Sequence, residues 1–354
     1  MNPKNCTPVP DRVFTKVIDT DKSERRTMKS RRAVILSTGR YLPETIVHNE
    51  DLDQFPDTAK YLISQKTGVF ARRRAGENEC TSDLAARAAL NCLDKSGFSA
   101  NAIDGIIVST SSPDRMQPAT ATRVQHLIKA CNAFAFDINS VCSGSTYGIT
   151  VADSLIRSGH CDTVLFIAAE LYSKILNPQD FSTFPYFGDG SGAILMTADS
   201  GRRGVLQSVL STEGSGCDVI SVPGGGTMMP YSRLRSPSDA CFHMKGKAVF
   251  EFAVTRGAEV IQQLLVKAAV SIDEIKCFFC HQANVNIITG IARKVEASVR
   301  FFYMNLFRYG NMASASILIA LDEALEKGVV QRGDLIMTVA FGGGLSWGAN
   351  LIEI

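Results

Sequence analysis

The stretch that decides the fold is Phe136-Asp137-Ile138-Asn139-Ser140-Val141-Cys142-Ser143-Gly144-Ser145-Thr146-Tyr147-Gly148. Residues 133–138, apolar except for Asp137, predict a buried strand, and apolar residues at helical spacing beyond Gly148 predict a helix. Cys142 therefore lies in a turn at the N-terminus of a helix, where the helix dipole and free backbone N–H groups stabilise a thiolate. A thiolate is the nucleophilic form of cysteine. The alternative is a small core cysteine, the commoner role of this residue, and the stretch by itself favours it.

Composition narrows the class of protein. The chain has 354 residues, enough for a large core and for two similar halves or domains. A net charge of only +2 argues against a nucleic-acid partner. Ten cysteines without an apolar secretory segment at the start indicate reduced thiols and a cytoplasmic location. No apolar run approaches the roughly 20 residues of a membrane span, so we expect no membrane association.

Residues 1–32 differ from the rest of the chain in charge. They hold nine Lys and Arg residues against four Asp and Glu residues and have no clear hydrophobic periodicity. We expect a basic, flexible N-terminal extension, and the alternative is a segment that attracts an acidic partner.

Two patterns recur along the chain and predict a duplicated fold. Residues 271–281 repeat the pattern of residues 102–110, and residues 333–340 repeat that of residues 161–168. We therefore expect an N-terminal half and a C-terminal half, over residues 33–200 and 205–354. Their alternating strands and helices predict mostly parallel sheets covered on both faces.

Three polar residues follow predicted strands in equivalent places of the two halves: Cys142, His281 and Asn311. Ligands of such sheets collect at the C-terminal ends of strands. A pseudo-twofold axis between the halves would bring the three side chains together there.

The segments between these patterns have local signals of their own. A helix is expected over residues 49–68, interrupted near Phe55-Pro56, and a glycine-rich turn over residues 187–193 leads into a strand. Residues 204–244 contain many loop-forming residues, and long loops in compact domains usually carry function.

Cys277-Phe278-Phe279-Cys280-His281 has the letters of a haem attachment motif and, with Cys241 and His243, offers a zinc ligand set. The segment is a predicted strand, in which residues three apart point to opposite faces. Cys277 and Cys280 are therefore interpreted as core thiols, whereas His281 begins a polar cluster at the strand end.

Five motifs together resemble the β-ketoacyl-acyl-carrier-protein synthase III family of the thiolase superfamily. They are the Cys142 strand–turn–helix, Phe187-Gly188-Asp189-Gly190-Ser191-Gly192-Ala193, His281-Gln282-Ala283-Asn284, Tyr309-Gly310-Asn311 and Phe341-Gly342-Gly343-Gly344-Leu345-Ser346-Trp347-Gly348. Their order and spacing resemble those of the family from about residue 33 to the end. The resemblance implies a thiolase-like α/β fold of two halves in layered αβαβα arrangement.

The resemblance also implies roles for residues. Cys142 would accept an acyl group, with the backbone N–H groups of Cys142 and Gly343 forming the oxyanion hole, and His281 and Asn311 would stabilise an enolate. The implied substrate-binding residues are Gln117, Phe181, Phe250, Phe341 and Asn284. The implied carrier-docking positions are Asn286, Arg293 and Lys294. The family implies a homodimer, acyl-coenzyme A or acyl-carrier-protein substrates, and no metal or redox cofactor.

The chain departs from the family pattern at several positions. Leu62 and Phe181 stand where the family has the tryptophan and arginine that sandwich the adenine of coenzyme A, and Asn286 stands where a docking arginine is common. Gln117 replaces an apolar residue that a dimer partner lends to the acyl pocket. These changes indicate a specialised member of the family.

Three functions remain open at this stage. The favoured one is decarboxylative Claisen condensation of an acyl group on Cys142 with a malonyl-type thioester, giving a β-ketoacyl product. The alternative within the fold is an acyltransferase of secondary metabolism that passes the acyl group to a hydroxyl or amine. The third is a non-catalytic protein that only binds carriers. The presence of both His281 and Asn311 favours condensation, because simple acyl transfer needs no enolate-stabilising pair.

Overall fold

The computed structural model describes residues 31–201 and 203–354, so the expected N-terminal extension lies outside the described residues except for its last two positions. Arg31 is held by an ion pair with Asp162 and donates hydrogen bonds to the carbonyls of Ile156 and Cys161. The chain therefore enters the described fold at a point fixed to the N-terminal half.

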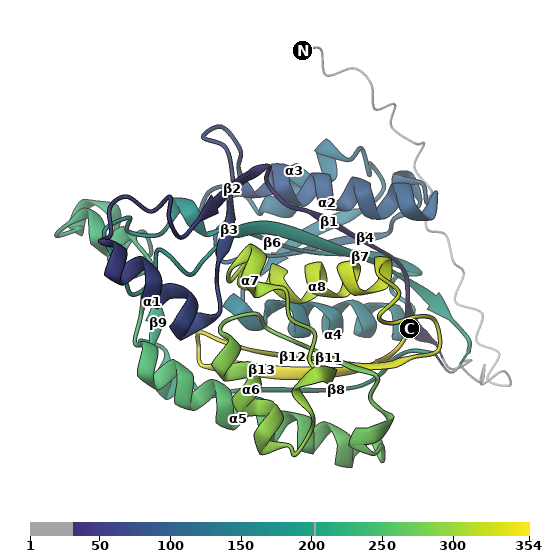
Figure 1. The fold of residues 1–354 in the computed structure, drawn as a ribbon. Helices are drawn as coiled ribbons and strands as arrows, with labels where there is room; N and C mark the ends of the chain where they lie inside the picture. Colours follow the sequence, from purple (N-terminus) through teal and green to yellow (C-terminus); the bar gives the residue numbers. More distant parts are fainter. Residues whose placement is uncertain (1–30, 202) are drawn as a thin grey trace, which may run out of the picture.

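Two sheets form the framework (Figure 1). The strands of the first sheet, in spatial order, are β1 (Arg32–Tyr41), β7 (Asp189–Asp199), β6 (Thr163–Leu171), β4 (Gly105–Ser109) and β5 (Phe134–Ile138). Those of the second sheet are β11 (Cys277–Cys280), β12 (Leu335–Gly342), β13 (Ser346–Glu353) and β8 (Gly204–Thr212). The pairs β2 (Thr45–His48) with β3 (Ala71–Arg74), and β9 (Ile220–Ser221) with β10 (His243–Met244), form two small ribbons.

The strand directions are mixed in both sheets. The pairs β4–β5, β4–β6 and β11–β12 are parallel, as expected for this fold class, and the remaining pairs of the two sheets are antiparallel. The central strands β4 and β6 are buried along their whole length, because their side chains are covered on both faces. The expectation of parallel strands therefore holds for these three pairs, β4–β5, β4–β6 and β11–β12.

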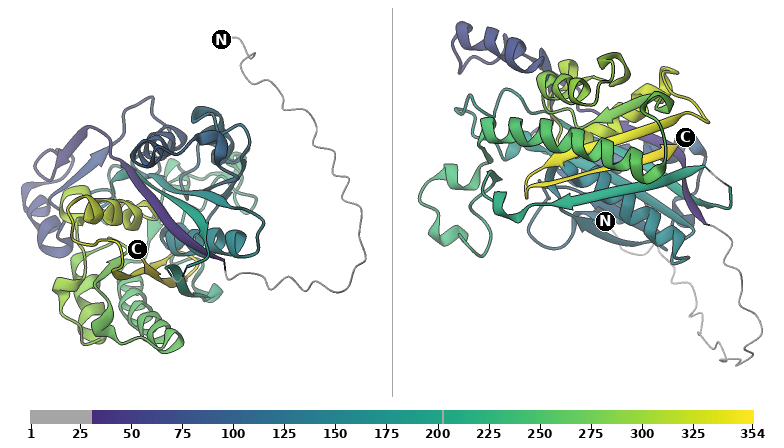
Figure 2. Two further views of the ribbon diagram at one scale, coloured as in Figure 1. Left: turned by 90° about the vertical axis from the view of Figure 1, so that its right-hand side faces the viewer. Right: turned by 90° about the horizontal axis from the view of Figure 1, so that it is seen from below.

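The helices and the two sheets stack in alternating layers, so the expected αβαβα arrangement is confirmed (Figures 1 and 2). The outer layer on the first sheet contains α2 (Thr81–Ser96) and α3 (Thr120–Leu127), and the outer layer on the second contains α5 (Gly246–Ala268) and α6 (Val285–Lys294). Between the sheets lie α4 (Gly144–Arg157) and α8 (Ala315–Glu326), one from each half. The remaining helices are α1 (Asp57–Thr67) and α7 (Leu306–Tyr309).

Close packing around α4 and α8 needs glycine on the facing elements. A Cβ at Gly148 would lie 2.1 Å from the Phe166 ring, and one at Gly192 would lie 2.5 Å from the Leu318 Cβ. Any side chain at either position would push the helix off its sheet. This explains the glycine-rich segment 187–193, whose expected turn is instead the start of β7, packed against α8.

Three further local expectations are corrected. Residues 49–56 are not helical, because α1 begins only after Pro56, whose ring fixes its own φ and disfavours helix in the residue before it. Residues 204–212, expected to be loop, form β8 at the edge of the second sheet. The strand expected to be buried, β5, is half-exposed, since it lies at the edge of the first sheet with a partner on one side only.

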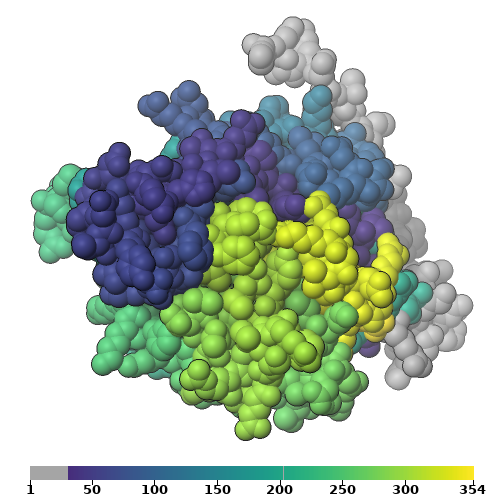
Figure 3. Space-filling model, in the orientation of Figure 1, coloured from purple at the N-terminus to yellow at the C-terminus, as the bar shows by residue number. Residues whose placement is uncertain are grey.

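The segment around α1 and the C-terminal half, which are distant in sequence, are in contact. Figure 3 shows the segment around α1, in purple, lying against the yellow-green C-terminal half. The Phe70 amide donates to the Phe307 carbonyl at 3.0 Å, and the Asn284 side chain donates to the Lys66 carbonyl at 3.2 Å.

Among the described helices, none combines the length and apolar character that a bilayer crossing demands.

Candidate active site

Cys142 lies in a short 3₁₀ turn, Val141–Ser143, that runs directly into α4. Its side chain is buried, with 5% exposure. Val141, immediately before it, has a left-handed backbone with φ of 46°, a conformation that is costly for a β-branched residue. The turn thus presents the thiol at the first turn of the helix, as the sequence predicts.

His281 follows β11 of the other half. Its backbone amide donates to the Val339 carbonyl at 2.8 Å, continuing the β11–β12 ladder. Its ring is buried, and Nδ1 lies 2.9 Å from the Ser316 hydroxyl, which itself lies 2.8 Å from the Ala313 carbonyl. Ser316 is therefore the residue that fixes the orientation of the imidazole.

Asn311 is held from both sides by the chain that precedes β7. Its amide donates to the Tyr186 carbonyl at 2.8 Å, and its carbonyl accepts from the Gly188 amide at 2.9 Å. Its side-chain oxygen accepts from the Ala313 amide at 2.9 Å, and Ala313 has a left-handed φ of 41°. With that oxygen engaged, the side-chain NH₂ is the group free to donate elsewhere.

Cys142, His281 and Asn311 line one cavity at the junction of the two halves. Its other walls are mainly apolar: Phe187, Ile220, Phe242, Met244, Val249, Phe252, Ala283, Phe341 and Gly342. The cavity has a volume of about 30 Å³, the space of one or two water molecules. The three polar residues therefore lie together at one cavity, as expected, and the pseudo-twofold axis between the halves stays a prediction.

Burial controls the protonation of the site. It raises the pKa of the Cys142 thiol well above its usual range, and the negative charge of Glu170 raises that pKa further. Burial lowers the pKa of His281 to about 3, so the imidazole is neutral at physiological pH. The pKa of the Cys142 thiol is thus raised where the sequence predicts a thiolate stabilised by the helix N-terminus, because the side chain is buried.

Gly343 lies in the loop that links β12 to β13, against the Cys142 turn. Its neighbour Gly342 is the one that lines the cavity, and a Cβ there would lie 2.8 Å from the Cys142 amide nitrogen. A hydrogen bond between the Ser143 and Ser346 hydroxyls joins the turn to the loop, and Ser346 also donates to the Gly343 carbonyl at 2.8 Å. The two segments expected to form the oxyanion hole are thus in direct contact.

The expected substrate-binding residues are not all at the cavity. Phe341 lines it, and its ring packs edge-on to His281 at 5.4 Å. Phe250 lies outside it and is 40% exposed, because Val249 and Phe252 occupy the inward face of α5. Phe181 packs against Phe55 at 5.2 Å, in an aromatic cluster away from the cavity.

Gln117 is exposed on the loop between β4 and α3 and does not line the cavity of its own chain. Asn284 caps α6 by accepting a hydrogen bond from the Asn286 amide at 2.7 Å. Asn286 donates to the Lys66 carbonyl at 2.8 Å. Arg293 and Lys294 are exposed at the C-terminal end of the same helix. The three expected docking positions therefore lie on one short helix beside α1, and the substrate position Asn284 caps that helix.

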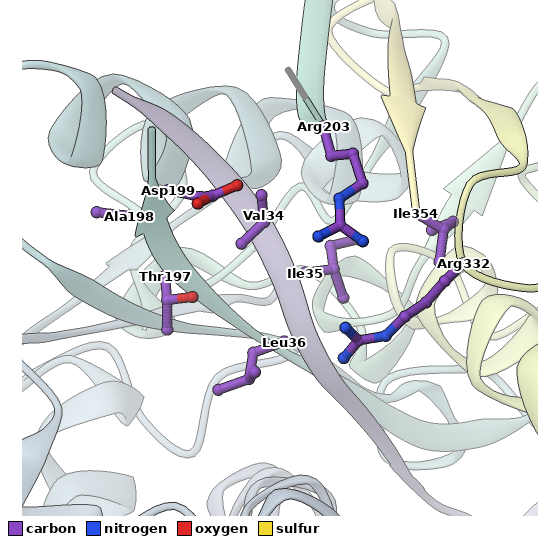
Figure 4. A pocket seen from close by; sticks show the side chains of 9 residues that line it. All are labelled: Val34, Ile35, Leu36, Thr197, Ala198, Asp199, Arg203, Arg332 and Ile354. Atoms are coloured by element: carbon purple, nitrogen blue, oxygen red, sulfur yellow. The ribbon is translucent and has the colours of Figure 1, made fainter. Parts of the chain in front are cut away.

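The other cysteines and a second cavity lie elsewhere. Cys277 and Cys280 are buried in β11, at 4% and 0% exposure, so their interpretation as core thiols is confirmed. A cavity of about 210 Å³ lies between β1, the end of β7 and the C-terminus, where Arg203 and Arg332 extend toward the same space (Figure 4). None of the three polar residues of the Cys142 site lines it.

Sequence reasoning missed several residues that shape the site. Ile220, Phe242 and Met244 form a cavity wall, and they come from the long segment that the sequence marks only as loop-rich. Arg72 is fully buried and donates to the Pro185 carbonyl at 2.7 Å, which supports the chain that holds Asn311. The run Arg72-Arg73-Arg74 gives no sign of this burial in the sequence, because charged runs normally lie in solvent.

The fold and the site together define a thiolase-fold condensing enzyme, an acyltransferase whose two halves supply a cysteine on one side and a histidine with an asparagine on the other. Two family models, "3-Oxoacyl-[acyl-carrier-protein (ACP)] synthase III" and its C-terminal counterpart, match residues 136–214 and 265–354. A beta-ketoacyl-[acyl-carrier-protein] synthase III of Clostridium tetani is 40% identical over 334 residues, which span 92% of this chain and 99% of that protein. The chain belongs to the β-ketoacyl-acyl-carrier-protein synthase III family, as the five motifs indicate.

Solved structures agree with this assignment. The 3-oxoacyl-[acyl-carrier-protein] synthase III of Aquifex aeolicus superimposes with a TM-score of 0.84 at 37% identity, covering 91% of this chain and all of that one. The priming β-ketosynthase of a polyketide biosynthetic pathway superimposes with a TM-score of 0.85 at 26% identity, covering 92% and 97% of the two chains. The expected thiolase-like fold is thereby confirmed.

Proposed function

We propose that this enzyme joins an acyl group carried on Cys142 to a malonyl-type thioester on an acyl carrier protein. The Cys142 sulfur attacks the donor thioester and the carrier leaves as a free thiol, which takes up the proton that Cys142 loses. The malonyl group then loses CO₂, and the resulting enolate attacks the acyl carbonyl and releases Cys142. The observation that carries the proposal is the convergence of Cys142, His281 and Asn311 on one cavity.

His281 and Asn311 have different tasks from Cys142. We assign them to the thioester carbonyl of the extender, where two neutral donors stabilise the enolate oxygen. Asn311 has its NH₂ available, because its oxygen is engaged by Ala313. His281 donates from Nε2 in the tautomer in which the Ser316 hydroxyl turns its one proton from the Ala313 carbonyl to Nδ1, so Ser316 sets the tautomer. Passing an acyl group to a hydroxyl or amine requires no such pair, and this favours condensation over the acyltransferase alternative.

The backbone amides of Cys142 and Gly343 are assigned to the oxyanion hole of acyl transfer. The contact between the Cys142 turn and the glycine loop supports this assignment. Because the cavity beside Cys142 is small, we expect the enzyme to accept short acyl groups best. Two points stay predictions from the sequence. The enzyme is expected to serve a specialised pathway of primary or secondary metabolism, and it is expected to be cytoplasmic.

We expect a homodimer formed through β5. Among the described strands it pairs with β4 alone, and its Phe134 and Phe136 rings stack at 6.2 Å, with Phe134 39% exposed. An unpaired apolar edge readily adds a further strand, and antiparallel pairing of two β5 strands would join the sheets of two chains. The exposed Gln117 loop would then reach the partner's cavity.

Light scattering should give twice the chain mass, and Phe134→Lys should yield monomers. Phe301→Lys is the matched control, because Phe301 is 38% exposed, close to the 39% of Phe134, but lies far from β5 in sequence. An active, monodisperse monomer of the unaltered protein would rule out the dimer.

We also expect carrier-bound acyl donors to load Cys142 faster than the matching coenzyme A esters. Leu62 is 39% exposed and offers no aromatic face, and Phe181 is engaged with Phe55. Stacking on an aromatic or guanidinium plane contributes roughly 1–3 kcal/mol per base. Its loss weakens capture of the coenzyme A adenine by about tenfold, at about 1.4 kcal/mol per factor of ten.

The measurement is the second-order rate of acylation with one acyl group on both carriers. Leu62→Trp combined with Phe181→Arg should raise the coenzyme A rate about tenfold and leave the carrier rate within twofold. Tyr61→Trp, on the same helix and 67% exposed, is the control. An equal or faster rate with coenzyme A in the unaltered enzyme would contradict the prediction.

A further inference from the structure

Glu170 is a fully buried carboxyl group at the end of β6, and the reaction proposed above does not use it. No ammonium or guanidinium group among residues 31–201 and 203–354 forms an ion pair with it. Burying a carboxyl group without a cation costs free energy, so hydrogen-bond donors must surround it. The segments that supply these donors are the ones that the side chain holds in place.

One carboxyl oxygen contacts the turn that carries Asn311. The Ser314 hydroxyl donates to Glu170 Oε1 at 2.7 Å. Ser314 is fully buried and lies between Asn311 and the start of α8. The residue before it, Ala313, donates from its amide to the Asn311 side-chain oxygen at 2.9 Å. Glu170 thus holds the end of the turn whose amide orients the Asn311 side chain.

The other carboxyl oxygen contacts the loop after β4. The Ser112 hydroxyl donates to Glu170 Oε2 at 2.8 Å, and Ser111 donates to the same atom from its amide and its hydroxyl, at 3.1 Å each. The Ser112 hydroxyl also accepts from the Leu171 amide at 2.8 Å, so its single proton is directed at Glu170. These donors fix the carboxyl group, and this places Oε1 for the hydrogen bond from Ser314.

The Asn311 turn needs support of this kind. Ala313 has a left-handed backbone with φ of 41°, which an alanine keeps only where its surroundings hold it. Ser314 is held on two sides, because its hydroxyl donates to Glu170 and its carbonyl accepts from the Ser145 hydroxyl in the first turn of α4. The support therefore comes from the N-terminal half, whereas Asn311 belongs to the C-terminal half.

We propose that Glu170 is a positioning residue, which anchors Ser314 so that the Ala313 amide holds the Asn311 side chain with its NH₂ free for the extender thioester. The inference rests on the proposed role of Asn311 in stabilising the enolate. Glu170 does not line the cavity and acts through two hydrogen bonds, from Ser314 to Glu170 and from Ala313 to Asn311. Loss of the anchor should therefore slow condensation and spare the acyl loading of Cys142.

The first test is Ser314→Ala, which removes the hydrogen bond to the turn and keeps the carboxyl group with its loop donors. The kcat of condensation, followed by labelled CO₂ and the β-ketoacyl product, should fall about tenfold with the extender KM within about twofold, because the interaction strengthens only in the transition state. Acyl loading, followed by intact mass, should stay within about twofold. Ser191→Ala is the matched control. It removes another fully buried serine hydroxyl, which contacts the Ala168 carbonyl at 3.2 Å, and should leave both rates within about twofold.

Two further variants test Glu170 itself. Glu170→Leu removes all of its hydrogen bonds at similar size and should slow condensation by about tenfold or more. Glu170→Gln should keep roughly a third of the activity or more: its oxygen faces the Ser111 amide, which can only donate, and its NH₂ meets the Ser314 hydroxyl, which can accept. Circular dichroism identifies any variant that fails to fold, and the folded variants decide. An equal loss in Glu170→Gln and Glu170→Leu would assign the effect to charge and overturn the proposal.

An Asn311→Ala background separates positioning from general damage. There Ser314→Ala should slow condensation by less than about twofold, because no Asn311 amide remains to be oriented. A further tenfold loss in that background would overturn the proposal, and so would unchanged condensation in Ser314→Ala alone. Failure of the proposed function gives a different result, in which Asn311→Ala by itself loses loading and condensation together.

Discussion

Replacing Cys142 with alanine should abolish acyl loading and reduce condensation by about 10⁴-fold or more. Removing the nucleophile of a covalent mechanism leaves only binding and oxyanion stabilisation. Incubation with an acyl thioester followed by intact mass spectrometry should show one added acyl group on the unaltered enzyme and none on Cys142→Ala. Decarboxylation of the extender should persist in the variant, because His281 and Asn311 are intact.

Two other cysteines serve as matched controls. Cys277→Ala and Cys280→Ala remove buried thiols from β11, which packs in the core behind the site. Each should cost on the order of 1–2 kcal/mol of stability and leave acyl loading within about twofold. A loss of loading in Cys280→Ala equal to that in Cys142→Ala would mean that the strand has been misinterpreted.

Removing either enolate-stabilising donor should separate the two half-reactions. His281→Ala and Asn311→Ala are each expected to lower condensation by about 10²–10³-fold, the usual cost of one oxyanion donor, or roughly 2.7–4 kcal/mol of transition-state stabilisation. Acyl loading should stay within about threefold, since Cys142 and its own oxyanion contacts remain. Loading is followed by intact mass, and condensation by release of labelled CO₂ together with the β-ketoacyl product.

The pH dependence of condensation gives a further check on the same pair. The pKa of His281 is lowered from 6.5 to about 3, so the ring stays neutral from pH 5 to 8 and only acidification toward pH 3 would protonate it. No inflection near pH 6.5 should therefore depend on His281. His48→Ala, at an exposed histidine, is the control for unspecific effects.

The half-reaction experiment has its own contradicting outcome. If loading and condensation fell together in His281→Ala, the division of roles between Cys142 and the His281–Asn311 pair would be wrong.

The recurring patterns and the order of the family motifs in the chain predict two halves and single out Cys142, His281 and Asn311. Strands and helices leave local periodicities, and the close approach of backbones leaves glycines such as Gly148 and Gly192, which are visible without any knowledge of tertiary contacts. A nucleophile at the start of a helix and donors after strands are likewise local features. The family motifs then select Cys142, His281 and Asn311, whereas the Cys142 stretch by itself favours a core thiol.

The exposure and protonation state of individual residues could not be predicted in this way. Both depend on which distant parts of the chain pack around each residue. The sequence predicts a stabilised thiolate from the helix N-terminus, yet burial by both halves and the charge of Glu170 raise the Cys142 pKa instead. Periodicity predicts a strand at β5 without showing that it is an edge. The choice of Val249 and Phe252 over Phe250 as cavity walls follows from the rotation of α5 on the second sheet, which only the packing of the sheet against that helix determines.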